Sequence, residues 1–267
     1  MAELTVNGVR LHVQQFGSGE RVAVFVHGLA VDNLSSWFFT LASSVSRKSE
    51  VVLYDLRGHG KSERPATGYA VSDMRADLVG LLDALDLGDR KIDLIGNSYG
   101  GLVAITMAVE HPERINSLVL LDAHVPDEHW SGRIQKMLTV EGEERDEWVA
   151  HTLRRVKDSY RDWLQTRSAL QNSGVTKQAR ALIDGTSLVA DIEQSPVFSE
   201  EQLAAIDCPV LAFYGEESDF RDRGELLATL LPDFDLRIVP EATHTVLWEA
   251  PERLKSEIVE WLEAHPG

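Results

Sequence analysis

The sequence predicts an α/β fold with a mostly parallel central sheet, helices on both faces and an inserted helical lid. Two observations predict the sheet and its helices: short, nearly continuous apolar runs recur along the chain, and segments with helical periodicity separate them. A third predicts the lid, because one long stretch interrupts this alternation. With 267 residues, 43% of them hydrophobic, the chain can bury the core of one large domain with an insertion.

The strand candidates are of two kinds. Residues 4–16 alternate apolar and polar side chains around Asn7-Gly8, a strong hairpin signal, which predicts an antiparallel pair at the start of the fold. The later candidates are apolar runs typical of strands that helices cover on both faces. They lie at residues 22–27, 51–55, 91–96, 117–122 and 209–215, with a last candidate at 235–240.

Helical periodicity is clearest in two segments. Residues 72–88 place five apolar side chains on one face, with Ser72 as the expected N-terminal cap and Gly88 as the expected end. Residues 251–264 begin with Pro251, which suits the first turn of a helix, and carry a second apolar face. We expect this second helix to close the domain.

Residues 123–200 contain helical patterns and no strand candidate. We therefore predict a helical lid at 123–200, inserted into a core domain formed by 1–122 and 201–267. Its tryptophans, Trp130, Trp148 and Trp163, are expected to form the lid core or to contact a substrate.

Charge and cysteine content narrow the function classes. The formal net charge of −17 would repel nucleic acid and anionic membranes, so the expected partner is a small molecule. No stretch is long and apolar enough for a membrane span, and the N-terminal residues lack the pattern of a signal peptide. Cys208 is the single cysteine, which excludes an intrachain disulfide. The expected location is therefore the cytoplasm.

One serine stands where a strand candidate meets a helix. In "LIGNSYGGLVA", residues 94–104, the segment from Gly96 to Gly100 reads G-x-S-x-G with Ser98 at its centre. This spacing is typical of a tight strand-to-helix turn that exposes the serine hydroxyl, and glycine removes the Cβ atoms that would collide there. The helix N-terminus directs free N–H groups at the same point. Ser98 is therefore the candidate nucleophile.

A serine nucleophile needs a base and an acid that orients the base. His244 is the candidate base, because it lies between the last strand candidate and the closing helix. His27 and His59 sit in glycine-bounded turns, where a structural role is expected. Asp219, in the loop after residues 209–215, is the candidate acid, with Asp122 at the end of residues 117–122 as the alternative.

Five segments together resemble the α/β-hydrolase fold family: "VFVHGLA" (24–30), "YDLRGHGKS" (54–62), "GNSYGG" (96–101), "YGEESD" (214–219) and "PEATHTVLWEAPERL" (240–254). The resemblance implies that the backbone N–H groups of Leu29 and Tyr99 form an oxyanion hole, and that a lid follows the sixth strand. In this family the acid commonly stands three residues after the glycine that ends its strand. Asp219 stands four residues after Gly215.

The elbow is also similar to those of hydrolases that cleave carbon–carbon bonds in ring-fission products. Such enzymes usually carry Gly-His-Trp around the base, whereas Thr243 and Thr245 flank His244. The sequence therefore favours a serine hydrolase that cleaves a small-molecule carboxylic ester, thioester or lactone. The alternatives are a carbon–carbon bond hydrolase, a lyase, cyclase or perhydrolase, and a ligand-binding receptor. No metal or other cofactor is expected, since H-E-x-x-H and P-loop patterns are missing.

Overall fold

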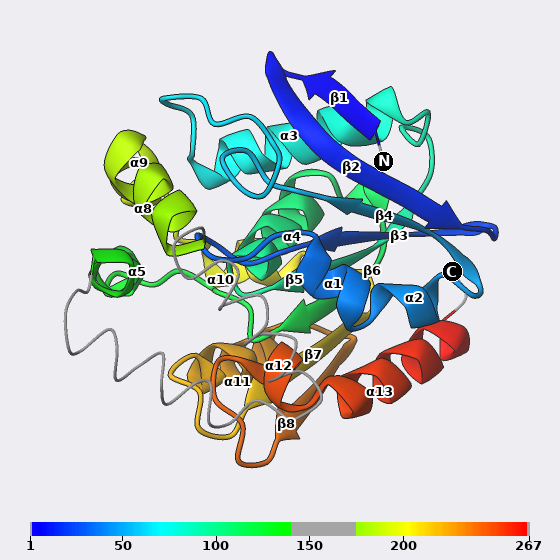
Figure 1. The fold of residues 1–267 in the computed structure, drawn as a ribbon. Coiled ribbons are helices and arrows are strands. Elements are labelled where there is room, and N and C mark those ends of the chain that lie inside the picture. Colours follow the sequence, from blue (N-terminus) through cyan, green and yellow to red (C-terminus); the bar gives the residue numbers. More distant parts are fainter. Residues whose placement is uncertain (1, 140–174, 266–267) are drawn as a thin grey trace.

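The computed structural model describes residues 2–139 and 175–265, and these form an eight-stranded sheet with helices on both faces (Figure 1). The strand order is β1-β2-β4-β3-β5-β6-β7-β8, and all pairs from β4 to β8 are parallel. The strands are β1 (Ala2–Val6), β2 (Val9–Gly17), β3 (Arg21–Val26), β4 (Ser49–Tyr54), β5 (Ile92–Asn97), β6 (Ile115–Leu121), β7 (Val210–Gly215) and β8 (Phe234–Val239). The predicted mostly parallel sheet is confirmed.

The predicted N-terminal hairpin is confirmed as well. β1 and β2 pair antiparallel with Val6 opposite Val9, and β2 in turn pairs antiparallel with β4. Asn7 and Gly8 form the two-residue loop with φ of 51° and 78°. Two successive positive φ values suit the twist of a tight hairpin, and asparagine followed by glycine tolerates them best.

Helices form a layer on each side of the sheet. The first layer holds α3 (Val71–Ala84), α4 (Tyr99–Glu110) and α11 (Arg221–Leu230); the second holds α1 (Ser35–Phe39), α2 (Ala42–Val45), α12 (Val246–Glu249) and α13 (Pro251–Ala264). Two further short helices in the described residues are the 3₁₀ helix Pro112–Arg114 and α10 (Glu200–Ala204).

Two apolar cores lie on opposite faces of the sheet. Along β3, Val22, Val24 and Val26 pack into the first core, while Ala23 and Phe25 pack into the second. Successive side chains of a strand point to opposite faces, so a strand covered on both sides needs an unbroken apolar run. This is the physical reason that the central strands were recognisable in the sequence.

One helix differs from its predicted bounds and one matches them. α3 ends at Ala84, because Asp86 rather than Gly88 adopts the left-handed conformation, with φ of 58°. At its start the cap is Ala70 instead of Ser72, and the Asp73 side chain accepts the Ala70 backbone N–H at 3.1 Å. α13 spans Pro251–Ala264, as predicted.

The described parts of residues 123–200 contain helices joined by loops. They comprise α5 (Trp130–Thr139), α8 (Val175–Gly185) and α9 (Leu188–Ile192), and residues 123–139 and 175–200 contain no strand. These helices lie beyond the ends toward which the parallel strands point (Figure 1). Trp148 and Trp163 lie outside the described residues. None of the helices in the described ranges is long and apolar enough to cross a bilayer.

Candidate functional site

Ser98 occupies a sharp turn between β5 and α4. Its φ of 55° and ψ of −117° fall outside the conformations that side-chain-bearing residues usually adopt, and its backbone N–H donates to the Leu121 carbonyl at 2.9 Å. A Cβ on Gly96 would collide with Gly100, and one on Gly100 would collide with the Val26 carbonyl. The glycines of the motif therefore allow the tight turn that presents the serine.

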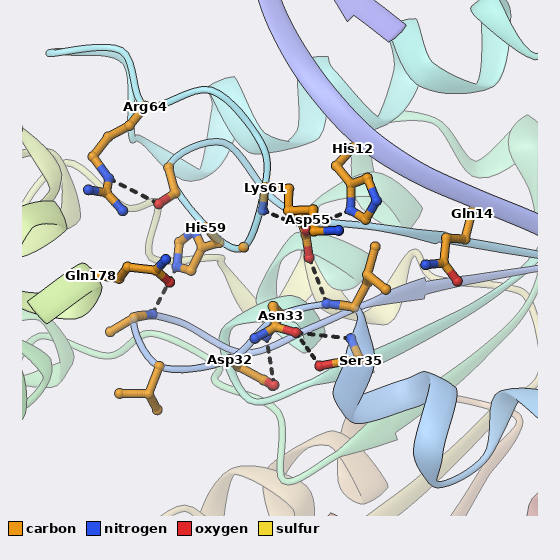
Figure 2. A pocket seen from close by; sticks show the side chains of 15 residues that line it. His12, Gln14, Asp32, Asn33, Ser35, Asp55, His59, Lys61, Arg64 and Gln178 are labelled. Atoms are coloured by element: carbon orange, nitrogen blue, oxygen red, sulfur yellow. Dashed lines mark hydrogen bonds and ion pairs between the residues drawn. The ribbon is translucent and has the colours of Figure 1, made fainter. Parts of the chain in front are cut away.

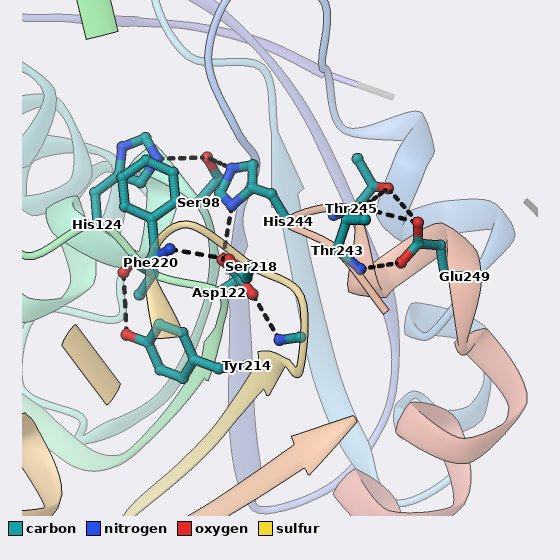
Figure 3. Close-up of polar contacts among 12 residues, drawn as sticks. Ser98, Asp122, His124, Tyr214, Ser218, Phe220, Thr243, His244, Thr245 and Glu249 are labelled. Carbon is teal, nitrogen blue, oxygen red and sulfur yellow. Dashed lines mark hydrogen bonds and ion pairs between the residues drawn. The ribbon is translucent and has the colours of Figure 1, made fainter. Parts of the chain in front are cut away.

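The structure brings Ser98 and His244 together from distant parts of the chain. His244 lies on the loop between β8 and α12, and its Nε2 is 2.9 Å from Ser98 Oγ (Figure 3). β5 and β8 are parallel, so the residues that follow them emerge at the same edge of the sheet. The His244 side chain is 21% exposed, which leaves this edge open to a ligand.

The carboxylate beside His244 is Asp122, and the choice of Asp219 is corrected here. His244 Nδ1 is 2.7 Å from Asp122 Oδ1, whereas Asp219 is exposed to solvent. Asp122 directly follows β6 and adopts a positive φ of 45°; its backbone N–H donates to the carbonyl of Phe213 in β7. The turn after β6 thus directs Asp122 toward the β7 side of the sheet and beneath His244.

The loop after β7 does not supply the acid; it donates hydrogen bonds to Asp122. The backbone N–H of Gly215 donates to Asp122 Oδ2 at 2.8 Å, and the Ser218 hydroxyl donates to Oδ1 at 2.5 Å. Ser218 stands three residues after Gly215, where the resembling family commonly has its acid. Asp122 has no exposed surface, and these donors compensate its burial. In the sequence, a serine instead of an acid at position 218 was the signal that favoured Asp122 over Asp219.

Glu249 fixes the loop that carries His244, and sequence reasoning missed it. Its carboxylate accepts the Thr243 backbone N–H at 2.6 Å and the hydroxyls of Thr243 and Thr245 at 2.8 and 3.1 Å (Figure 3). Glu249 is nearly buried at 8% exposure. The two threonines that distinguish this chain from Gly-His-Trp sequences therefore hold the histidine loop in place.

Two backbone N–H groups near Ser98 have no hydrogen-bond partner among the described residues. In the loop after β3, the N–H groups of Gly28 and Ala30 donate to Asp32 and His59, but that of Leu29 does not donate. The N–H of Tyr99, at the start of α4, does not donate either. These are the two groups that the family resemblance implies for an oxyanion hole.

His27 and His59 are structural, as expected. His27 Nδ1 lies 2.6 Å from the Gly28 carbonyl, and its Nε2 accepts the Leu56 N–H at 3.0 Å. His59 bonds the Arg57 carbonyl and the Ala30 N–H in the same way. Burial, reinforced by the neighbouring His27, lowers the pKa of His59 to about 3, so its ring stays neutral.

A second histidine, His124, lies near Ser98. Its ring is 3% exposed, and its Nε2 lies 3.3 Å from Ser98 Oγ. It stacks on His244 with ring centroids 5.3 Å apart, and the Trp130 ring packs against it at a steep angle, with centroids 5.6 Å apart. In the sequence, its position two residues after Asp122, past the end of a buried strand, was the signal that could have identified it as a site residue.

A separate polar cavity of about 270 Å³ lies beside the loops after β3 and β4 (Figure 2). Asp32, His59, Lys61 and Arg64 line it, but Ser98, Asp122 and His244 do not. The described residues contain no cluster of three or more histidine, cysteine or acidic side chains placed to hold a metal ion.

A hydroxyl bonded to an imidazole, which in turn bonds a buried carboxylate, can act as a nucleophile at neutral pH. The imidazole accepts the hydroxyl proton, and the carboxylate fixes its tautomer and stabilises the imidazolium that forms. Unpaired backbone N–H groups beside the hydroxyl can stabilise an oxyanion. The site therefore has the parts required for acyl transfer.

The chain is similar to known proteins over most of its length. A model described as the alpha/beta hydrolase family matches residues 23–257. The 2-hydroxy-6-oxononadienedioate/2-hydroxy-6-oxononatrienedioate hydrolase of Burkholderia vietnamiensis is 25% identical, over 95% of this chain and 91% of the relative. The 2-(acetamidomethylene)succinate hydrolase of Mesorhizobium japonicum is 26% identical, over 97% and 94%. A solved esterase from Thermogutta terrifontis shares the fold, with a TM-score of 0.75 at 24% identity over 99% and 98% of the two chains.

Proposed function

The chain belongs to the alpha/beta hydrolase family, and we propose that it hydrolyses a small-molecule carboxylic ester, thioester or lactone through an acyl-enzyme on Ser98. One observation carries the proposal. Ser98 Oγ is 2.9 Å from His244 Nε2, while His244 Nδ1 is 2.7 Å from the buried carboxylate of Asp122. The proposed catalytic residues are therefore Ser98, His244 and Asp122, and Asp122 replaces Asp219 in the orienting role.

In the first half of the proposed reaction, Ser98 Oγ attacks the acyl carbon while His244 Nε2 takes the hydroxyl proton. The carbonyl oxygen becomes an oxyanion that accepts hydrogen bonds from the N–H groups of Leu29 and Tyr99. As the tetrahedral intermediate collapses, His244 returns the proton to the leaving alkoxide, thiolate or lactone oxygen. The acyl group remains on Ser98.

In the second half, water replaces the leaving group. His244 removes a proton from the water, whose oxygen attacks the acyl-enzyme and forms a second oxyanion. The proton then passes from His244 to Ser98 Oγ, which releases the carboxylic acid and restores the enzyme. Throughout, Asp122 keeps the Nδ1 proton of His244 in place, so that Nε2 is the nitrogen that faces the reacting atoms.

Residues 123–200 are proposed as a lid that supplies substrate selectivity. Its described helix α5 begins at Trp130, whose indole is buried and lies beside His124 and Tyr99. Contacts from an inserted helix alter the pocket without touching the chemical groups. We place the reaction in the cytoplasm, because the single cysteine gives no indication of an oxidising compartment.

Acylation of Ser98 tests the proposal directly. With p-nitrophenyl acetate, we expect the wild-type protein to turn over and to gain an acetyl mass on Ser98 in rapid-quench mass spectrometry. Ser98→Ala should show no adduct and lose at least about 10³-fold in kcat, with an unchanged melting temperature. A variant that keeps more than about a tenth of the wild-type kcat would refute the proposal. A receptor without turnover would release no more than one equivalent of nitrophenol.

A second candidate function is cleavage of a carbon–carbon bond in a ring-fission product. The match to the Burkholderia vietnamiensis relative, which extends over 95% of this chain, favours it. The same groups would serve: His244 takes a proton from the water that attacks the carbonyl carbon and returns it to the carbanion that leaves. Loss of the ultraviolet–visible absorbance of a 2-hydroxy-6-oxodienoate, measured beside the p-nitrophenyl ester, ranks the two substrates by kcat/KM.

A further inference from the structure

The Ser98 hydroxyl lies between two imidazole rings, and only one of them is used in the mechanism above. His244 Nε2 is 2.9 Å from Ser98 Oγ and His124 Nε2 is 3.3 Å from it (Figure 3). The rings are nearly parallel, with an interplanar angle of 18°. His124 is also tied to the serine through its backbone, whose N–H donates to the Ser98 carbonyl at 3.1 Å.

The number of protons available in the site determines which atom donates in the contact between His124 and Ser98. Ser98 has one hydroxyl proton. His244 uses its Nδ1 proton on the carboxylate of Asp122, so its Nε2 is a bare acceptor that takes the hydroxyl proton. His124 Nε2 can then meet Ser98 Oγ only as a donor. Burial, with the positive potentials of His244 and Arg133, holds the pKa of His124 well below its usual range, so the ring carries a single proton.

The other ring nitrogen of His124 supports this assignment. Its Nδ1 is buried and has no hydrogen-bond partner among the described residues. A neutral ring protonated on Nε2 has no proton on Nδ1, so the unpartnered nitrogen is an acceptor and not a lost donor. Phe220 and Trp130 pack against the ring, with centroids at 4.4 and 5.6 Å, and these contacts set the ring plane.

Structural histidines in the same protein look different. Both ring nitrogens of His27, and both of His59, bond backbone groups of neighbouring loops. In the described part of the chain, the hydroxyl of Ser98 is the one hydrogen-bond partner of the His124 ring. Most buried side-chain nitrogens that serve only the fold have a backbone or side-chain partner.

We propose that His124 is a second catalytic histidine, which donates its Nε2–H to Ser98 Oγ and stabilises the negative charge that develops on this oxygen. This role rests on the proposed function, because it requires Ser98 to be the nucleophile. The charge develops twice: when Ser98 loses its proton to His244, and when the Ser98 oxygen leaves the acyl group. His124 keeps its proton in both steps, since His244 performs the proton transfers.

The geometry also predicts which substitutions preserve the role. In His124→Gln, the side-chain amide N–H reaches about the position of Nε2, so the donor is kept. In His124→Asn the amide lies near the position of Nδ1 and does not reach Ser98. His124→Phe keeps a planar ring between Phe220 and Trp130 but has no donor. The three variants therefore separate the hydrogen bond from the packing.

The readout is phosphonylation of Ser98 by an alkyl fluorophosphonate, followed by intact-mass and peptide mass spectrometry. Ser98 Oγ forms a bond to phosphorus and fluoride leaves, so the rate reports the reactivity of the serine without the natural substrate. We expect the second-order rate constant to fall about tenfold or more in His124→Asn and His124→Phe, and to stay within about threefold of wild type in His124→Gln. The melting temperature of each variant, measured alongside, identifies a folding defect.

Other outcomes overturn the inference. If His124→Phe reacts like the wild type, the ring only packs; if His124→Gln falls as far as the other two variants, the donor is not what Ser98 needs. Should His124→Phe not fold, the comparison of His124→Gln with His124→Asn decides in the same way. A wild-type protein that is not modified at Ser98 instead contradicts the proposed function itself, so the two failures are distinguishable.

Discussion

Among the described residues, two histidines pair with a buried carboxylate, and only one of these two pairs faces a reactive group. His12 Nδ1 is 2.9 Å from Asp55, and His244 Nδ1 is 2.7 Å from Asp122. Both carboxylates are almost fully buried, and both accept backbone N–H groups as well. The pairs are therefore alike in distance and in the burial and hydrogen bonding of their carboxylates. A histidine beside an aspartate does not by itself identify an active site.

The serines near the two pairs make the difference. Ser62 donates its hydroxyl to the Asp55 carbonyl and accepts the His12 backbone N–H, so its oxygen is held by the main chain (Figure 2 shows His12 and Asp55). Ser98 instead stands on a strained turn with its hydroxyl toward the His244 ring. The His244 side chain is 21% exposed, against 8% for His12. Strain and exposure distinguish the reactive pair from the structural one.

The largest effect is expected from Asp122→Asn. Asparagine would keep the size of the side chain but favour the wrong tautomer of His244, so we expect kcat to fall about 10³- to 10⁴-fold. Steady-state kinetics on a p-nitrophenyl ester checks this. Asp219→Asn is the matched control, and it should change kcat by less than about twofold because Asp219 is exposed. If Asp219→Asn loses much more kcat than Asp122→Asn, then Asp219 is the acid, as the sequence predicted.

The fold was more predictable than this carboxylate, for a physical reason. Strands buried on both faces need unbroken apolar runs, and the serine turn needs glycines where Cβ atoms would collide, so both leave signals in the local sequence. The position of Asp122 depends on how the turn after β6 meets β7, which is a contact between distant residues. The same holds for His124 and Glu249, whose partners are set by the tertiary fold.

Moving the carboxylate from position 122 to position 218 tests whether the β7 loop can supply the acid. Ser218 Oγ already contacts Asp122 Oδ1, so Asp122→Asn combined with Ser218→Asp places a carboxylate on the β7 loop beside the same imidazole. We expect this double variant to regain about ten- to a hundredfold of the kcat lost in Asp122→Asn alone. The matched control is Asp122→Asn with Ser218→Asn, which should regain nothing. Equal kcat values in the two double variants would show that the acid position is not exchangeable.

Breaking the other pair should affect stability instead of rate. Asp55 accepts hydrogen bonds from the backbone N–H groups of Leu34 and Lys61 as well as from His12, and an amide can replace only part of them. We expect Asp55→Asn to lower the free energy of unfolding by about 1–3 kcal/mol, with kcat changed by less than about threefold. Urea unfolding followed by circular dichroism gives the first value. A loss of kcat as large as that of Asp122→Asn would place Asp55 in the reaction.

The smallest effect concerns pH and is expected from the buried His59. Its pKa is lowered to about 3, first by burial and then by the neighbouring His27, so it stays neutral in the native state where the unfolded chain would bind a proton. Between about pH 6.5 and 3 the unfolded state binds more protons, and His59 therefore makes the protein less stable as pH falls, by at most about 1.4 kcal/mol per pH unit. In His59→Gln this contribution disappears, so the free energy of unfolding should fall less steeply between pH 7 and pH 5 than in the wild type. The exposed His129 provides the control, since His129→Gln should keep the wild-type slope. Identical slopes in all three proteins would mean that the native state accepts a proton on His59 as readily as the unfolded chain does, and that the two hydrogen bonds of the His59 ring do not hold it in the neutral form.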